Sequence, residues 1–180
     1  MNIKNSSNKF KIILSVGDES GVGPEIILKA LDSDEIPKTI DFVLVGSKKN
    51  LQNTYTYLKS LGLKNIANPN DFHIHDPEIS SSDKNSKSSY GNSSFYYLAK
   101  AIEIVKEYPN SALVTGPICK KSWSLAGHNF SGQTEVLAKS CGVNNVGMLF
   151  TAKSPITGWR FNTLLATTHI ALSEIPKTLN

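Results

Sequence analysis

A chain of 180 residues in which 39% of the residues are hydrophobic and 19% are charged has the composition of a globular protein, not of a disordered or fibrous one. Its formal net charge of +4 comes from scattered lysines, which do not form the dense basic block that favours nucleic-acid binding. The sequence has no apolar run near the roughly 20 residues of a membrane helix, no apolar core in its polar N-terminus and no CxxC pair, so we expect a cytoplasmic protein with neither nucleic-acid nor membrane partners.

The first part of the chain alternates between short apolar runs and amphipathic stretches. Strands are predicted over 11–16 (KIILSV) and 41–46 (DFVLVG), each ending at a glycine. Helices are predicted over 24–31, where Pro24 suits the first helical position, and over 49–61, where apolar residues recur at helical spacing. This β-α-β-α order predicts an α/β fold with a mostly parallel sheet and helices on both faces.

The later part of the chain begins with a polar segment. Residues 80–94 (SSSDKNSKSSYGNSS) have low complexity, and we expect a mobile polar loop there. The next elements in chain order are predicted to be a helix over 95–108, a strand over 112–115, a helix across 135–140, strands over 146–151 and 164–168, and a last helix that Ser173 could cap. The sequence ends about where that last helix would cover the sheet, so we expect the natural fold to need more chain.

Two glycine-containing turns follow predicted strands. The segment 17–25 (GDESGVGPE) is neither GxGxxG nor a Walker A loop, which argues against a P-loop nucleotidase. Asp18 is the one side chain in it that could reach a ligand, although hydrogen bonding within the turn explains an aspartate there at least as well. In the segment 114–121 (VTGPICKK), Lys120 could meet a phosphate or polarise a carbonyl, or could be an ordinary surface lysine.

Two further segments contain candidate ligand-binding residues. Gln133 and Thr134 precede a predicted helix, where an amide and a hydroxyl can bind a polar substrate, unless Thr134 serves only as a helix cap. His169 follows a predicted strand and could bind a metal, but a zinc site normally needs at least three protein ligands. His73 and His75 form an H-x-H pair that we interpret as surface histidines and not as a metal site.

Together these segments resemble one enzyme family, the 4-hydroxythreonine-4-phosphate dehydrogenases. GDESGVGPEIILKAL is similar to the family's opening GDPAGIGPEI segment, ALVTGPICK to VTGPINK, SGQTEVLA to GHTE, and LLATTHIALSEIP to TTHIPL. The four segments occur in the family order and spacing across nearly the whole chain. The resemblance implies that residues 1–180 are the N-terminal portion of a two-domain enzyme, with a fold like the isocitrate and isopropylmalate dehydrogenases.

The resemblance also implies an activity. Members of the 4-hydroxythreonine-4-phosphate dehydrogenase family are homodimers that oxidise 4-phosphooxy-L-threonine, a small phosphorylated amino acid, with NAD. The resulting 2-amino-3-oxo acid loses carbon dioxide and gives 3-amino-2-oxopropyl phosphate, in the biosynthesis of pyridoxal phosphate (vitamin B6). A divalent metal (zinc, magnesium or cobalt) would hold the substrate hydroxyl and carbonyl oxygens and stabilise the enolate, and the nicotinamide would accept the hydride.

Individual residues can be matched to the family motifs. His169 matches the family's first metal-binding histidine, and Thr134 matches a substrate-binding threonine. Gln133 stands where many members have a substrate-binding histidine; glutamine can hydrogen-bond a phosphate or a hydroxyl but cannot become cationic near neutral pH. Two other departures, Glu19 in place of proline and Cys119 in place of asparagine, fall on positions to which we assign no chemistry.

Most of the family's cofactor-binding residues find no counterpart in this sequence. The two later metal histidines, and most residues that bind NAD and phosphate, would lie beyond residue 180, so we assign no NAD-binding residue within the chain. We expect a truncated family member, either a fragment or half of a split enzyme completed by a C-terminal chain, and we expect the isolated chain to be inactive. The alternative is a non-catalytic module, derived from that family, that binds a phosphorylated ligand or a partner.

Overall fold

The computed structural model describes residues 9–77, 79, 86–167 and 170–179. Contacts divide the chain into two compact units, residues 1–133 and residues 134–180. Within the described ranges, no helix combines the length and the apolar character that crossing a membrane requires.

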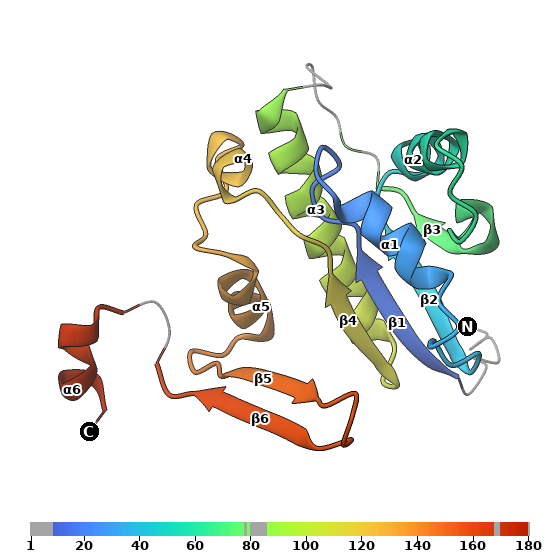
Figure 1. Ribbon diagram of the computed structural model, residues 1–180. Helices are drawn as coiled ribbons and strands as arrows, with labels where there is room; N and C mark the ends of the chain where they lie inside the picture. The colour runs from blue at the N-terminus through green and yellow to red at the C-terminus, as the bar shows by residue number, and fades with distance from the viewer. Residues whose placement is uncertain (1–8, 78, 80–85, 168–169, 180) are drawn as a thin grey trace, which may run out of the picture. The chain divides into compact units, whose positions relative to one another are not determined.

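The first unit is built on a four-stranded parallel sheet (Figure 1). Its strands are β1 (Phe10–Ser15), β2 (Ile40–Val45), β3 (His73–His75) and β4 (Ser111–Thr115), in the spatial order β3-β2-β1-β4. The register places Ile13 of β1 between Val43 of β2 and Leu113 of β4. Since every pair is parallel, the carboxyl ends of all four strands lie along one edge of the sheet. In α/β proteins that edge is where ligands bind.

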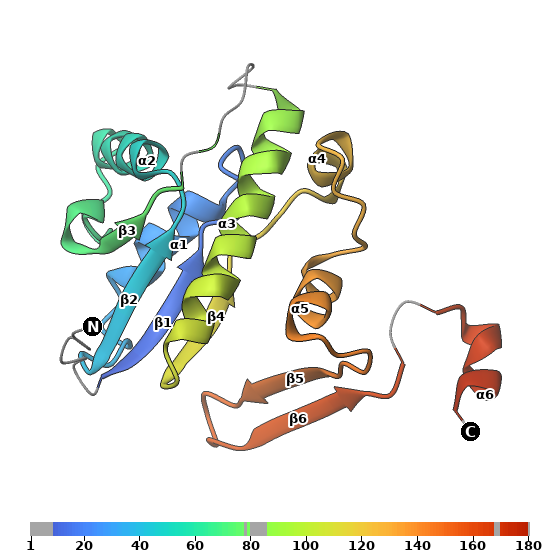
Figure 2. The same cartoon turned by 180° about the vertical axis from the view of Figure 1, so that it is seen from behind.

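Helices cover both faces of this sheet, as Figure 1 and the reverse view in Figure 2 show. The helices of the first unit are α1 (Gly23–Leu31), α2 (Lys48–Ser60), the short η1 (Pro69–Asp71), α3 (Lys87–Glu107) and α4 (Lys120–Leu125). Leu14 of β1 packs with Leu28 of α1, whereas the neighbouring Ile13 packs with Ala101 of α3. Successive strand residues therefore face opposite helical layers. The predicted α/β class, with a mostly parallel sheet and helices on both faces, is confirmed.

The N-terminal end of α3 differs from the prediction. The sequence predicts a loop over 80–94, but α3 already begins at Lys87, so the prediction is wrong for the last part of that segment. Residues 80–85 lie outside the described residues. Ser86 caps the helix, because its hydroxyl oxygen accepts a hydrogen bond from the Ser89 N–H at 3.1 Å.

Close packing between α3 and α4 explains the small residues in this part of α3. A Cβ atom on Gly91 would lie 2.0 Å from the Ser122 carbonyl oxygen, so the two backbones could not approach this closely around a larger residue. The fully buried Trp123 donates a hydrogen bond from Nε1 to the Ser94 hydroxyl at 2.7 Å. The serines and glycine that make the segment look like a loop therefore serve a helix contact. α4 itself is not predicted, since its six residues are too few to show a helical period.

The second unit contains an antiparallel hairpin and not a further strand of the parallel sheet. Its elements are α5 (Gln133–Cys141, which begins at the boundary residue), β5 (Met148–Lys153), β6 (Arg160–Leu165), η2 (Leu172–Glu174) and α6 (Ile175–Thr178). Within the ranges that the structure describes, β5 and β6 pair only with each other. The sequence predicts a strand over 164–168, but β6 ends at Leu165. Gly158, with φ of 72°, lies in the turn that reverses the chain between β5 and β6.

Candidate functional site

Two glycine turns cross at the carboxyl edge of the parallel sheet. The N–H of Asp18, in the turn after β1, donates a hydrogen bond to the Pro117 carbonyl oxygen, in the turn after β4, at 2.9 Å. A Cβ atom on Gly17 would lie 2.3 Å from the Pro117 oxygen, and one on Gly116 would lie 2.3 Å from the Val16 carbonyl oxygen. Both glycines are therefore needed for the two backbones to approach each other. The crossing joins motifs that are a hundred residues apart in the chain.

Asp18 is buried at this crossing, with 6% of its surface exposed. Its Oδ1 accepts two hydrogen bonds from Ser20, one from the backbone N–H at 2.9 Å and one from the hydroxyl at 2.7 Å. These bonds organise the turn, as the alternative interpretation of this aspartate expects. A contact between Asp18 and a substrate stays a prediction.

Gln133 is bound to the same crossing from another segment. Its Nε2 donates a hydrogen bond to the Gly116 carbonyl oxygen at 2.8 Å. A carbonyl oxygen can only accept, so the nitrogen of the amide must be the atom that faces Gly116. The other amide atom, Oε1, then remains as a hydrogen-bond acceptor. Gln133 and Asp18 therefore bind the carbonyl groups of two successive residues, Gly116 and Pro117, in the turn after β4.

Of the remaining candidate residues, the structure describes Lys120 and Thr134. The Lys120 side chain is exposed at the start of α4, and in the described part of the chain it forms no hydrogen bond or ion pair. Thr134 is half-buried near the start of α5 and belongs to the second unit. His169 lies outside the described residues.

Glu19 is a residue at this edge to which sequence reasoning assigns no chemistry. The Tyr97 hydroxyl, on α3, donates a hydrogen bond to Glu19 Oε1. Burial is the largest influence on Glu19 and raises the pKa of its carboxyl; the charges of Asp76 and Asp18 raise this pKa further, while the bond from Tyr97 lowers it. Burial and the nearby Glu19 likewise raise the pKa of Tyr97. The only feature of the sequence that points to Glu19 is that it places a carboxylate where the similar family motif has proline.

Cys119, the other departure noted above, lies at the N-cap of α4 and is half-buried. Hydrogen bonds from the side chain and the backbone of Ser122 lower the pKa of its thiol. The thiol is thus more easily ionised than an ordinary cysteine.

The described residues do not by themselves form a metal site. No group of three His, Cys, Asp or Glu side chains that could hold a metal ion is found among them. His73 is exposed on β3 and His75 is half-buried, in keeping with their interpretation as surface histidines. The His128 ring is instead stacked on Phe95, with ring centroids 3.8 Å apart, and burial lowers its pKa. The divalent metal that the family resemblance implies is therefore not accommodated by these residues alone.

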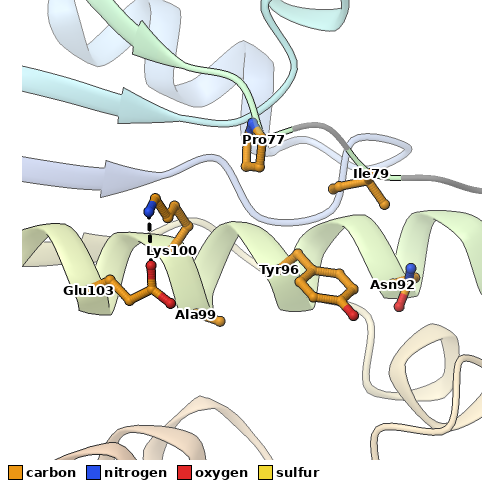
Figure 3. Close-up of a pocket in the computed structure, with 7 residues that line it drawn as sticks. All are labelled: Pro77, Ile79, Asn92, Tyr96, Ala99, Lys100 and Glu103. Carbon is orange, nitrogen blue, oxygen red and sulfur yellow. Dashed lines mark hydrogen bonds and ion pairs between the residues drawn. The ribbon is translucent and has the colours of Figure 1, made fainter.

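A hollow of about 360 Å³ lies along α3 (Figure 3). Lys100 and Glu103 on its wall form an ion pair, with Nζ and Oε2 2.9 Å apart, so their charges offset each other. The hollow is lined by Pro77, Ile79, Asn92, Tyr96, Ala99, Lys100 and Glu103. None of these residues belongs to the crossing turns.

Comparison with known proteins identifies the family. The family model described as "Pyridoxal phosphate biosynthetic protein PdxA" matches residues 38–180. The chain belongs to the PdxA family. The family predicted from the four sequence segments is thus confirmed.

Relatives in the PdxA family are about twice as long. The 4-hydroxythreonine-4-phosphate dehydrogenases of Synechococcus sp. (strain RCC307) and Nostoc sp. (strain PCC 7120) are each 41% identical to this chain, over 171 and 184 residues. The alignments cover 94% and 97% of this chain and 51% of each relative, so the chain spans about half the length of the curated relatives it matches.

Solved PdxA-family structures share the fold. The 4-hydroxythreonine-4-phosphate dehydrogenases of Burkholderia phymatum and Klebsiella pneumoniae superimpose on this chain with TM-scores of 0.72 and 0.71. The superpositions cover 95% and 97% of this chain, and 53% and 55% of those chains, at 20% and 23% sequence identity. At that identity the similarity shows the fold alone.

Proposed function

We propose that this chain supplies one half of the active site of a 4-hydroxythreonine-4-phosphate dehydrogenase in the cytoplasm. The reaction would be the NAD-dependent oxidation and decarboxylation of 4-phosphooxy-L-threonine to 3-amino-2-oxopropyl phosphate, in pyridoxal phosphate biosynthesis. Membership of the PdxA family and relatives of that name at 41% identity support the proposal. Assembly as a homodimer, with the remaining half of each site in the same or a complementing chain, belongs to the same proposal.

The observation that carries this proposal is the crossing of the two glycine turns with Gln133 bound to it. Residues of three of the four family-like segments meet there, because Asp18 and Pro117 are joined through their backbones and Gln133 binds through its side chain. They converge at the carboxyl ends of parallel strands, which is the edge where α/β enzymes bind substrates.

The orientation of Gln133 gives the proposed site a defined polarity. Because Nε2 is used by the Gly116 carbonyl, Oε1 would accept a hydrogen bond from a substrate hydroxyl or ammonium group. The second N–H of Nε2 could still donate to the substrate phosphate, and the exposed Lys120 is the proposed cation for that phosphate. The hydroxyl of Thr134 can donate or accept, and its proposed role is to bind the same substrate.

The proposed cofactors are NAD and a divalent metal, namely zinc, magnesium or cobalt. NAD would take up the hydride from the substrate. His169 is the one metal ligand that we propose within this chain, and the remaining ligands would come from elsewhere in the complete enzyme. Since the described residues contain no group of three side chains that could hold a metal ion, we expect the isolated chain to be inactive.

Complementation tests the proposal. The 180-residue chain is assayed for NADH formation alone, and after mixing with the C-terminal half of the Synechococcus relative, in the presence of substrate, NAD and zinc or magnesium. We expect turnover only in the mixture, and a lower kcat/KM when the chain bears Gln133→Ala. Gln52→Ala is the control, since Gln52 is the chain's other glutamine and lies on α2.

The outcomes separate the enzyme from its alternative. Turnover by the isolated chain, or a stable complex of the two halves without turnover, would contradict the proposal of a half-site. Tight binding of a phosphate ester by the chain in the absence of metal, again without turnover in any mixture, would instead favour a non-catalytic binding module.

A further inference from the structure

Glu19 ties the turn after β1 to helices on opposite faces of the parallel sheet. Its Oε1 accepts a hydrogen bond from the hydroxyl of Tyr97, on α3. Its backbone carbonyl oxygen accepts a hydrogen bond from Nδ2 of Asn50, on α2, at 3.3 Å. The conformation of the turn therefore depends on both helical layers through one residue.

Tyr97 is the fixed member of this pair. Its side chain is 2% exposed and packs with Ile13 and Ala101 in the core between α3 and the sheet. The ring cannot follow the turn without disturbing that core, so the turn must come to the hydroxyl. The Ser93 side chain also hydrogen-bonds Tyr97, and Glu19 supplies the carboxylate acceptor that brings the turn to this buried hydroxyl.

The charged groups around the Glu19 carboxyl are acidic. Asp18 lies in the same turn, and Asp76 follows β3 and accepts a hydrogen bond from the Lys48 backbone N–H at 2.9 Å. In the described part of the chain no cation contacts the Glu19 carboxylate. Two neighbouring carboxylates and partial burial favour a proton on Glu19, whereas the Tyr97 hydroxyl favours the ionised form.

We propose that Glu19 and Tyr97 are positioning residues that hold the turn containing Asp18 by a hydrogen bond whose strength changes when Glu19 gains or loses a proton. A carboxylate accepts a hydrogen bond more strongly than a carboxylic acid, so the ionised form binds the turn more firmly to α3. The similar family motif has proline at this position, and a proline ring fixes the backbone by itself. Here a side-chain bond replaces that constraint and makes it depend on pH. The consequence for substrate rests on the proposed function, because Asp18 is a candidate substrate contact.

The test follows the turn itself by nuclear magnetic resonance of the ¹⁵N-labelled 180-residue chain. We expect the Ser20 and Gly21 amide signals to titrate with a midpoint above 4.5, the ordinary glutamate value. Glu19→Gln should abolish this transition while keeping an acceptor for the tyrosine, and a transition that persists unchanged in this variant would overturn the inference.

Three further variants test how the neighbouring groups shift the midpoint of the Glu19 titration. Tyr97→Phe should move the midpoint to higher pH, because it removes the bond that favours the carboxylate. Asp76→Asn should move it to lower pH, because it removes a negative charge while keeping an acceptor for the Lys48 N–H. Tyr96→Phe is the matched control, since this neighbouring tyrosine of α3 is exposed and should leave the midpoint unchanged.

A wild-type midpoint at or below 4.5, or one that Tyr97→Phe leaves unchanged, would overturn the inference. Should Tyr97→Phe prevent folding, an unchanged midpoint in Asp76→Asn would overturn it as well. The signals require neither substrate nor turnover, so a failed complementation assay contradicts the proposed function and leaves this inference standing.

Discussion

Gln133 combines two tasks in one side chain. Its amide nitrogen binds the Gly116 carbonyl and so fixes the crossing of the two glycine turns, while its oxygen is left to accept a bond. A histidine, which many family members have here, could donate the same bond but would also titrate near neutral pH. Glutamine keeps the donor and removes that titration. We therefore expect the geometry at this point of the site to be independent of pH, in contrast to the turn that Glu19 holds.

Gln133→Leu tests the structural half of this argument. Leucine occupies a similar volume but leaves the Gly116 carbonyl without its donor, and losing one partner of a partly buried hydrogen bond costs about 1–2 kcal/mol. We expect a loss of that size in the free energy of unfolding measured with urea. Gln52→Leu, at the chain's other glutamine, should change it by less, and equal losses would show that the bond to Gly116 contributes nothing specific.

The sequence was informative about some site residues and silent about others for a physical reason. Gln133 and Asp18 stand in motifs with recognisable spacing, and both reach the crossing of the turns. Glu19 has a partner 78 residues away, on a helix whose other residues show only an apolar stripe. A hydrogen bond between such distant residues leaves no local pattern, so no window of sequence could have revealed Tyr97 as its donor.

At the scale of elements, composition and packing gave opposite indications for the start of α3. A run rich in serine, asparagine and glycine is typical of loops, because these residues are weak helix formers. The observed helix forms there because α4 needs a close neighbour, which only small residues permit. Tertiary contact thus outweighs local propensity. The strands predicted for the parallel sheet show no such conflict, and their bounds agree with β1, β2 and β4 to within about one residue, whereas the three-residue β3 is not predicted.

Gly91→Ala should therefore destabilise the protein although alanine is the better helix former. Alanine gains about 1 kcal/mol in helix propensity, but its Cβ would meet the Ser122 carbonyl oxygen at 2.0 Å. Overpacking against backbone costs about 1–3 kcal/mol or more, so the clash dominates. We expect a lower urea midpoint for Gly91→Ala. Gly21→Ala, whose nearest contact would be an ordinary 3.5 Å, should leave the midpoint nearly unchanged, and a stabilised Gly91→Ala would refute the packing argument.

At the scale of the whole molecule, the two units differ in how fully their strands are covered. The parallel sheet has helices on both faces, as its continuous apolar strands predict. The β5–β6 hairpin has only two strands, and several of its apolar side chains are exposed: Leu149, Phe150, Phe161 and Leu164. An isolated two-stranded hairpin is marginally stable in water. The sequence indicated these strands but not their antiparallel pairing, since a short apolar run does not show which strand it will join.

The exposed hairpin should make the 180-residue chain associate with itself. Leu149 and Leu164 are paired across the two strands, and 62% and 67% of their surfaces are exposed. Burying such a pair against a second chain removes apolar surface from water, so sedimentation velocity should show species larger than a monomer that grow with concentration. The double variant Leu149→Ser/Leu164→Ser should shift this equilibrium towards the monomer.

Lys153→Ser/Arg160→Ser is the matched control. Lys153 and Arg160 lie opposite each other on the same face of the hairpin as the two leucines, and both are exposed. If the control reduces association as much as the leucine variant, charge and not apolar contact drives it; if the wild-type chain remains a monomer at every concentration, the exposed leucines are not a self-association surface.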